Sequence, residues 1–124
     1  MKTAKDFLEE AHNSVKRIPT EEGIERHKKG DTVFVDVRDS SDIAKSGTIA
    51  GALRVPRGFL EFAADSNTQF HREQLKKDAD ICLVCGAGGQ AALAGKTLQE
   101  MGFTSVYNVG GIGDWKAAGG PVED

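Results

Sequence analysis

A thiol at the head of a glycine-rich loop is the side chain best placed for chemistry. Cys85 follows an apolar run, 81–84, and precedes three glycines within four residues. The run is typical of a buried strand, and residues 90–101 carry apolar side chains at helical spacing. A strand, a glycine loop and a helix in this order aim backbone N–H groups and the positive end of the helix at one point. Such a point stabilises a thiolate, the form of cysteine that acts as a nucleophile.

Length and composition limit the classes of protein to consider. The 124 residues suffice for one domain with a single core, and a mean hydropathy of -0.38 is typical of a soluble chain. No apolar run approaches the roughly 18 residues of a membrane span, and the N-terminus has no apolar signal segment. A net charge of -3 provides no basic patch for nucleic acid or an anionic membrane. We therefore expect a cytoplasmic protein with neither of these partners.

The segments around the loop alternate between strand and helix patterns. Predicted strands cover 31–37, 52–55, 81–84 and 104–109, and predicted helices cover 2–17, 20–29, 57–64, 70–77, 90–101 and a short stretch around Trp115. This alternation predicts a mainly parallel sheet with helices on both faces. Ligands bind such sheets beyond the carboxyl ends of the strands. Cys85, the segment 36–38 and Gly110 with Gly111 all fall at such ends, so we expect them to converge on one rim.

The second cysteine and the histidines favour no separate site. Cys82 stands in mid-strand among apolar neighbours and is expected in the core. It forms a C-x-x-C pattern with Cys85, but an extended strand separates side chains three residues apart, which argues against a redox disulfide. His12, His27 and His71 have no metal-ligand spacing and are expected at the surface. We expect neither a metal nor another cofactor.

Two other loop chemistries fit the sequence poorly. Residues 86–91 match the dinucleotide pattern G-x-G-x-x-A, but the following strand, 104–109, ends without the acidic residue that this site needs. A phosphatase loop would need an arginine six positions after the cysteine to hold the phosphate oxygens. Ala91 stands there.

From about Thr20 to Glu123 the chain resembles a single-domain rhodanese, a sulfurtransferase homology domain. The resemblance rests on four landmarks taken together, namely Val35-Asp36-Val37-Arg38, the segment 46–52, Cys85 with its loop, and the segment 110–115. It implies an α/β fold with a mainly parallel central sheet of about five strands and helices on both faces. It leaves residues 1–17 as an extra N-terminal helix beside a domain of residues 18–124.

The resemblance implies a sulfur-transfer reaction at Cys85. Its thiolate would attack the outer sulfur of a donor such as thiosulfate, and a thiol or cyanide acceptor would then remove the sulfur from the resulting persulfide. Since a persulfide is anionic, backbone N–H groups of the loop would hold it; these groups belong to Gly86, Ala87, Gly88, Gly89 and Gln90. Transfer in two steps predicts ping-pong kinetics. The implied partners are small sulfur donors and acceptors or a sulfur-relay protein.

Two loop positions depart from the family pattern of cysteine, two residues, glycine, one residue, arginine, and serine or threonine. Gln90 replaces the arginine and Ala91 the hydroxyl residue. A lost ion contact of this kind costs about 1–3 kcal/mol, or roughly tenfold to a hundredfold in binding or rate. Arg57, or otherwise Arg38 or Arg54, is the candidate for the missing cation.

The remaining landmark residues have a structural interpretation. Asp36 and Arg38 are expected to fix the loop after their strand as a pair. An alternative function stays open, in which the domain is a sulfur carrier or protein-interaction module with little or no turnover. The catalytic hypothesis requires that loop N–H groups face the Cys85 thiol and that the thiol be reachable from solvent.

Overall fold

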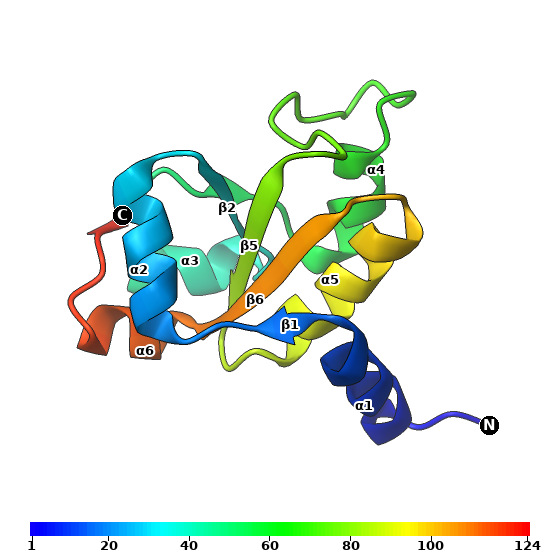
Figure 1. Cartoon of the computed structure of the whole chain (residues 1–124), viewed down its shortest axis with the longest axis horizontal. Coiled ribbons are helices and arrows are strands. Elements are labelled where there is room, and N and C mark those ends of the chain that lie inside the picture. Colours follow the sequence, from blue (N-terminus) through cyan, green and yellow to red (C-terminus); the bar gives the residue numbers. More distant parts are fainter.

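A computed structural model describes all 124 residues and shows an α/β fold (Figure 1). Its helices are α1 (Ala4–Ser14), α2 (Thr20–Lys29), α3 (Ser40–Ser46), α4 (Leu60–Ala64), α5 (Gly89–Glu100) and α6 (Ile112–Ala117), with a 3₁₀ turn, η1 (Arg57–Phe59), before α4. Its strands are β1 (Lys16–Arg17), β2 (Thr32–Asp36), β3 (Thr48–Ile49), β4 (Leu53–Arg54), β5 (Asp80–Cys85), β6 (Ser105–Gly111) and β7 (Val122–Glu123).

Five parallel strands form the main sheet in the order β1-β6-β5-β2-β4. The register places Cys85 opposite Gly111 and Val84 opposite Asp36, so the carboxyl ends of β2, β5 and β6 meet at one rim as expected. Strand β4 lies beside β2, and β3 forms a separate antiparallel pair with β7. The predicted α/β class, with about five parallel strands and an additional N-terminal helix, is confirmed.

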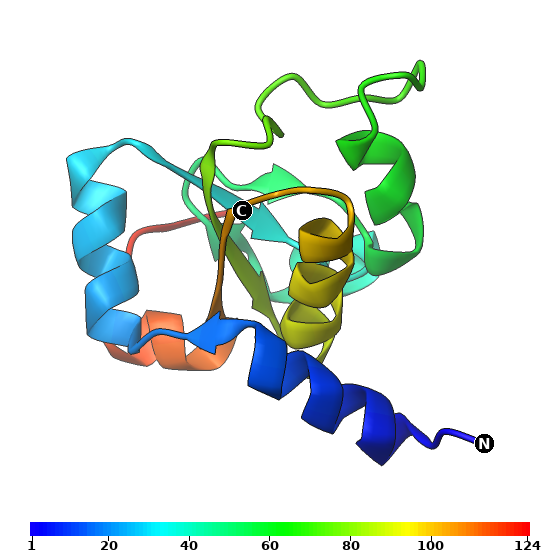
Figure 2. The same ribbon diagram turned by 45° about the vertical axis from the view of Figure 1, so that its right-hand side comes forward.

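Helices cover both faces of the sheet, and each face has its own apolar core. Figure 2 shows α2 and α6 on one side of the sheet and α4 and α5 on the other. Side chains alternate between the faces along β5, as the two-residue period of a strand requires. Ile81, Leu83 and Cys85 belong to the core under α4 and α5, whereas Cys82 and Val84 pack with Trp115 on the opposite face.

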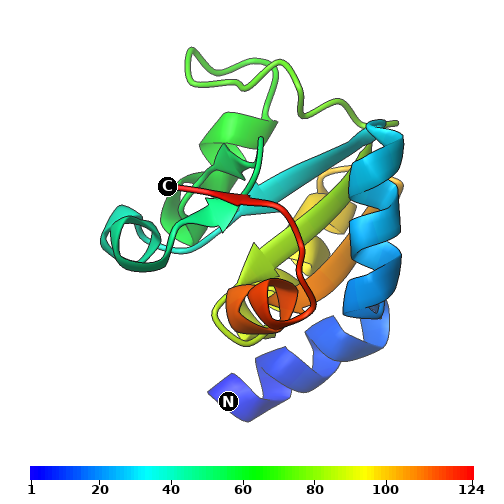
Figure 3. The same ribbon diagram turned by 90° about the vertical axis from the view of Figure 1, so that its left-hand side faces the viewer.

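The N-terminal segment is attached to the domain by both of its elements, α1 through α5 and β1 through the sheet. Helix α1 begins at a capping box, in which the Thr3 hydroxyl accepts a hydrogen bond from the Asp6 N–H and the Asp6 carboxylate accepts one from Thr3. The helix packs against α5, where a Cβ on Gly95 would lie 2.9 Å from the methyl groups of Val15. Strand β1 then pairs with β6 at the edge of the sheet. Figure 3 shows α1 at the bottom, the end at which β5 terminates.

Several local predictions differ from the structure. Residues 70–77 form turns and no helix, because buried Leu75 is held by the turn bond from its N–H to the Arg72 carbonyl and by the bond from the Arg72 N–H to Ala63. His27 and His71 are half-buried rather than at the surface, and their Nε2 atoms lie 2.8 Å from the Ala50 carbonyl oxygen and 3.2 Å from the Leu75 carbonyl oxygen, respectively. No helix of the chain combines the length and the apolar character that a membrane crossing needs.

Candidate active site

The segment 86–91, called the active loop below, holds the thiol of Cys85 against two backbone N–H groups. The cysteine is the last residue of β5, and α5 begins four residues later. The N–H of Gly88 donates to Cys85 Sγ at 3.0 Å and the N–H of Ala91 donates at 3.3 Å. Hydrogen bonds from N–H groups stabilise the charged form of the sulfur more than the neutral thiol. The arrangement is therefore suited to holding a thiolate or another anionic sulfur.

The set of N–H groups differs from the one named from the sequence. Of the five expected N–H groups, only that of Gly88 donates to the sulfur. The second donor is the N–H of Ala91, a residue that the sequence marks only by its lack of the hydroxyl in the family pattern. The backbone N–H groups of the other four expected residues make no hydrogen bond to Sγ; these residues are Gly86, Ala87, Gly89 and Gln90. The first turn of α5 thus supplies half of the contacts, in keeping with the role of helix N-termini in binding anions.

A buried asparagine on the neighbouring strand supports the loop. Asn108 is 1% exposed, and its Nδ2 donates to the Gly88 carbonyl oxygen at 2.9 Å while its Oδ1 accepts from the Gly110 N–H at 2.8 Å. A bulge in β6 opposite Leu83 and Val84 accompanies this contact, since an extra residue re-aims side chains next to a site. Gly88 itself has φ +106°, which only glycine adopts readily.

The thiol is covered in this conformation. Cys85 is 1% exposed, while Gly86, Ala87 and Gln90 around it are exposed. Of the two conditions that the sequence hypothesis required, N–H groups that face the sulfur are present and an open route from solvent is absent. Cys85 lines none of the cavities, so a donor can reach Sγ only if residues around it move.

Asp36 and Arg38 form a buried pair at the end of β2, beside the loop. Arg38 is 6% exposed and Asp36 is fully buried, and Arg38 Nη2 donates to Asp36 Oδ2 at 2.8 Å. Thr48 donates to the same carboxylate at 2.7 Å, and Arg38 also donates to the Gly47 carbonyl oxygen at 2.8 Å. These hydrogen bonds link the pair to each other, to Thr48 and to Gly47, the residue between α3 and β3. The pair therefore holds the α3–β3 loop in place.

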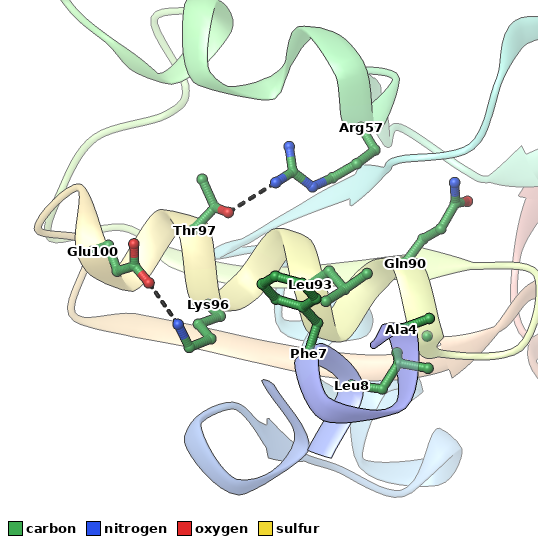
Figure 4. Close-up of a pocket in the computed structure, with 10 residues that line it drawn as sticks. Ala4, Phe7, Leu8, Arg57, Gln90, Leu93, Lys96, Thr97 and Glu100 are labelled. Atoms are coloured by element: carbon green, nitrogen blue, oxygen red, sulfur yellow. Dashed lines mark hydrogen bonds and ion pairs between the residues drawn. The ribbon is translucent and has the colours of Figure 1, made fainter. Parts of the chain in front are cut away.

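The three candidate arginines lie in different surroundings. Arg38 is occupied by Asp36, and Arg54 pairs with Glu123 near the C-terminus at 3.4 Å. Arg57 lies near the loop, where its Nη2 donates to Thr97 Oγ1 at 2.9 Å and its Nη1 pairs with Glu61 at 3.1 Å (Figure 4). Arg57 and Gln90 line one cavity, Arg38 and Gln90 line a second one, and Arg54 shares no cavity wall with Gln90.

A cavity of about 670 Å³ opens beside the loop, between α1, α5 and η1. Apolar atoms form most of its wall, although only four of its ten lining residues are apolar, and Figure 4 shows Phe7, Leu8 and Leu93 grouped together with Gln90 and Arg57 at the rim. Phe7 is 49% exposed, so its ring faces open space. The Gln90 amide makes no hydrogen bond and is free to contact a ligand.

The second cysteine is set apart from this chemistry. Cys82 is fully buried on the opposite face of the sheet, and both cysteines are free. Burial raises the pKa of the Cys82 thiol to about 12, and the nearby Arg26 guanidinium lowers it only in part. Cys82 therefore remains a neutral core thiol at physiological pH.

The structure also brings Arg17 of β1 to the loop, a residue that the sequence did not single out. A Cβ built on Gly88 would lie 2.5 Å from Arg17 Nη1, and one built on Gly110 would lie 2.5 Å from Arg17 Nη2. The side chain comes from a two-residue edge strand at the end of the predicted N-terminal helix. No local pattern marks such a short strand. The one available signal is that Arg17 is a basic residue close before residue 20, where the resemblance to the family begins.

Known proteins resemble the chain over most of its length. The family description Rhodanese-like domain matches residues 20–118. Thiosulfate sulfurtransferase GlpE of Pseudomonas putida is 34% identical over 104 residues, 82% of this chain and 86% of that protein. A Bacillus subtilis protein provisionally named a sulfur carrier is 29% identical over 66% of this chain and 40% of its own length. The structure of a Rhodopseudomonas palustris protein of unknown function, described as a possible tyrosine phosphatase, matches with a TM-score of 0.91 at 36% identity, covering 99% and 96% of the two chains.

Proposed function

This chain belongs to the rhodanese-like family, and from that membership we propose that it transfers sulfane sulfur through a persulfide on Cys85. The donor is a compound such as thiosulfate, and the acceptor is cyanide or a thiol. The observation that carries the proposal is the pair of N–H groups, of Gly88 and Ala91, directed at Cys85 Sγ. They would stabilise anionic sulfur at each stage of the reaction.

The reaction proceeds in two displacements. The Cys85 thiolate attacks the outer sulfur of thiosulfate, a new S–S bond forms, and the original S–S bond breaks so that sulfite leaves with the electron pair. The acceptor, such as cyanide, then attacks the outer sulfur of the persulfide. Thiocyanate leaves and the thiolate is regenerated, so no external oxidant or reductant is needed. Because the first product departs before the acceptor reacts, ping-pong kinetics are expected.

The cavity between α1, α5 and η1 is the proposed approach for substrates. Arg57 and Gln90 line it, and they would contact the anionic end of a donor, Arg57 with its charge and Gln90 with its amide donors. The outer sulfur of a persulfide stands about 2 Å beyond Sγ, which brings it nearer the exposed loop residues than the thiol. Movement of the loop glycines, including Gly86, would complete the route.

Mass spectrometry of the intact protein tests the first displacement. Incubation with thiosulfate should add one sulfur, about 32 Da, to the wild type and none to Cys85→Ala. Thiocyanate formation should likewise depend on Cys85 and show parallel lines in double-reciprocal plots. Cys82→Ala is the matched control, since Cys82 lies on the opposite face, and it should keep the sulfur adduct. A wild type that takes up no sulfur from any donor contradicts the proposal.

A second candidate function is a sulfur carrier or interaction module with little turnover. The burial of the Cys85 thiol favours the carrier function, as does the uncharged Gln90 in the loop. A carrier would form little thiocyanate yet accept sulfur efficiently from a cysteine desulfurase. Gln90→Arg separates the explanations: if the missing charge limits donor binding, its activity with thiosulfate should rise roughly tenfold or more. An unchanged rate removes that explanation.

Phosphate-ester hydrolysis is not supported by the loop. A phosphatase of this fold needs a guanidinium six positions after the cysteine to bind the phosphate oxygens in the transition state. Ala91 occupies that position and is fully buried. The two free cysteines also fit a reducing compartment, so we propose the cytoplasm as the site of action.

A further inference from the structure

We propose that Arg17 is a positioning residue of the active loop and that its guanidinium supplies, from outside the loop, the positive charge absent at Gln90. The proposal deepens the proposed function, because the sulfur atom that it acts on is that of Cys85. Its effect on the thiol is measurable without any sulfur transfer. The two ideas can therefore fail separately.

The guanidinium lies between two glycines that belong to the site. Added Cβ atoms on Gly88 and Gly110 would each come within 2.5 Å of one of its nitrogens. Gly88 donates to Cys85 Sγ, and Gly110 donates to the side chain of Asn108 that holds Gly88. A side chain at either glycine would displace the guanidinium, so Arg17 packs on the backbone that presents the N–H group to the sulfur.

The charge of Arg17 is not neutralised by the protein. Arg17 forms no ion pair with any carboxylate and no side-chain hydrogen bond. In contrast, Arg38 is paired with Asp36, Arg54 with Glu123 and Arg57 with Glu61. Arg17 is exposed, so no carboxylate cancels its charge at the loop but solvent and salt screen it in part.

Four short links, two of them single covalent bonds (N–Cα and Cα–Cβ of Gly88), give the range of this interaction. The Gly88 nitrogen is 3.0 Å from Sγ, its Cα is one bond further, and the Cβ position on that Cα is 2.5 Å from Arg17 Nη1. The guanidinium nitrogen is thus at most about 8.5 Å from the sulfur. At that distance a unit charge favours the thiolate over the thiol by about twofold in a water-like medium and by roughly tenfold or more nearer the protein interior.

The cation comes from a part of the chain outside the family match. Residues 20–118 carry the rhodanese-like domain, and Arg17 lies before them on the edge strand β1. The same N-terminal segment provides Phe7 and Leu8 for the cavity wall. The segment thereby contributes both a surface and a charge to the site.

The test is the pH dependence of Cys85 alkylation by iodoacetamide, followed by peptide mass spectrometry. Removal of the charge in Arg17→Gln should raise the pH midpoint of alkylation by about 0.4 to 1 unit, equivalent to about twofold to tenfold in the thiolate-to-thiol ratio. Arg17→Lys keeps the charge and should restore the wild-type midpoint. Lys16→Gln is the matched control, since it removes one charge from the adjacent residue, whose side chain points to the other face of the strand.

Salt and plateau rates separate charge from structure. A loop that merely loosens changes the plateau rate at high pH and leaves the midpoint unchanged. A charge effect weakens as salt rises from about 0.05 to 1 M, because the Debye length shrinks to about 3 Å. Wild-type protein alone should show this salt dependence, which keeps the test valid if Arg17→Gln fails to fold.

Equal midpoints for Arg17→Gln, Lys16→Gln and the wild type, or a midpoint insensitive to salt, overturn the proposal. Loss of sulfur transfer with the predicted midpoints intact refutes the proposed function instead.

Discussion

Replacement of Asn108 by alanine should destabilise the protein through the active loop. The Asn108 side chain is almost fully buried and bridges two backbone groups, the Gly88 carbonyl at 2.9 Å and the Gly110 N–H at 2.8 Å. Alanine removes the side-chain partner of the Gly110 N–H in the interior, whereas the Gly88 carbonyl oxygen keeps a hydrogen bond from the Ala92 N–H at 3.0 Å. An orphaned buried group costs about 1–3 kcal/mol and a lost hydrogen bond about 0.5–1.5 kcal/mol, so the free energy of unfolding should fall by about 1.5–4.5 kcal/mol. The lower end applies if a water molecule enters the vacated space.

Urea unfolding followed by circular dichroism measures this loss. With a slope of about 2 kcal/mol per molar urea for a small domain, the midpoint should fall by about 1–2 M and the slope should stay the same. Asn67→Ala is the matched control, because Asn67 is exposed and its side chain makes no hydrogen bond. If Asn108→Ala unfolds at the wild-type midpoint, the loop is not held by this bridge and the reasoning fails.

Three further predictions concern the surroundings of the site. Burial raises the pKa of the Cys82 thiol to about 12, so that thiol stays protonated and unreactive at pH 7–9. Native protein at that pH should therefore take up one iodoacetamide, at Cys85. Labelling of Cys82 would contradict this prediction. Asp36→Asn leaves the Arg38 guanidinium buried without a counter-charge and should lower the free energy of unfolding by about 3–5 kcal/mol in urea titrations; a change below about 1 kcal/mol would show the pair to be dispensable. Phe7→Ser removes an apolar part of the cavity wall. It should raise KM for an aromatic thiol acceptor about threefold to tenfold while KM for cyanide stays constant. An equal rise of both KM values would mean that the cavity does not select the acceptor.

Local patterns predicted most of the fold because the information for each element lies within the element. The β-branched run of β2 and the apolar run of β5 mark buried strands. Thr3 marks the start of α1, and Gly30 marks the end of α2 with φ +81°. The helix predicted over 70–77 was wrong because this polar stretch is held in turns, with the Arg72 N–H bonded to the Ala63 carbonyl of α4.

Very short strands escaped prediction for a related reason. The strands β1, β3 and β7 contain two residues each, too few for any periodic pattern. They exist because a partner strand lies within hydrogen-bonding distance, β6 for β1 and β7 for β3. Their existence therefore depends on the packing of distant segments rather than on their own residues.

The sequence by itself determined where the candidate nucleophile stands. Cys85 follows a strand and precedes glycines and a helix, and this order of residue types is sufficient to place the thiol at the carboxyl edge of the sheet. Strand and helix patterns are local, so they persist without knowledge of the tertiary fold.

Only the tertiary structure decided what surrounds that thiol. It selected the N–H groups of Gly88 and Ala91, covered the sulfur, and brought Arg17, which no local pattern marks, to the loop. These contacts join segments up to about seventy residues apart in the chain. Hydrogen bonds and charges act over a few ångströms, and such distances are set by how the elements pack and not by spacing along the sequence.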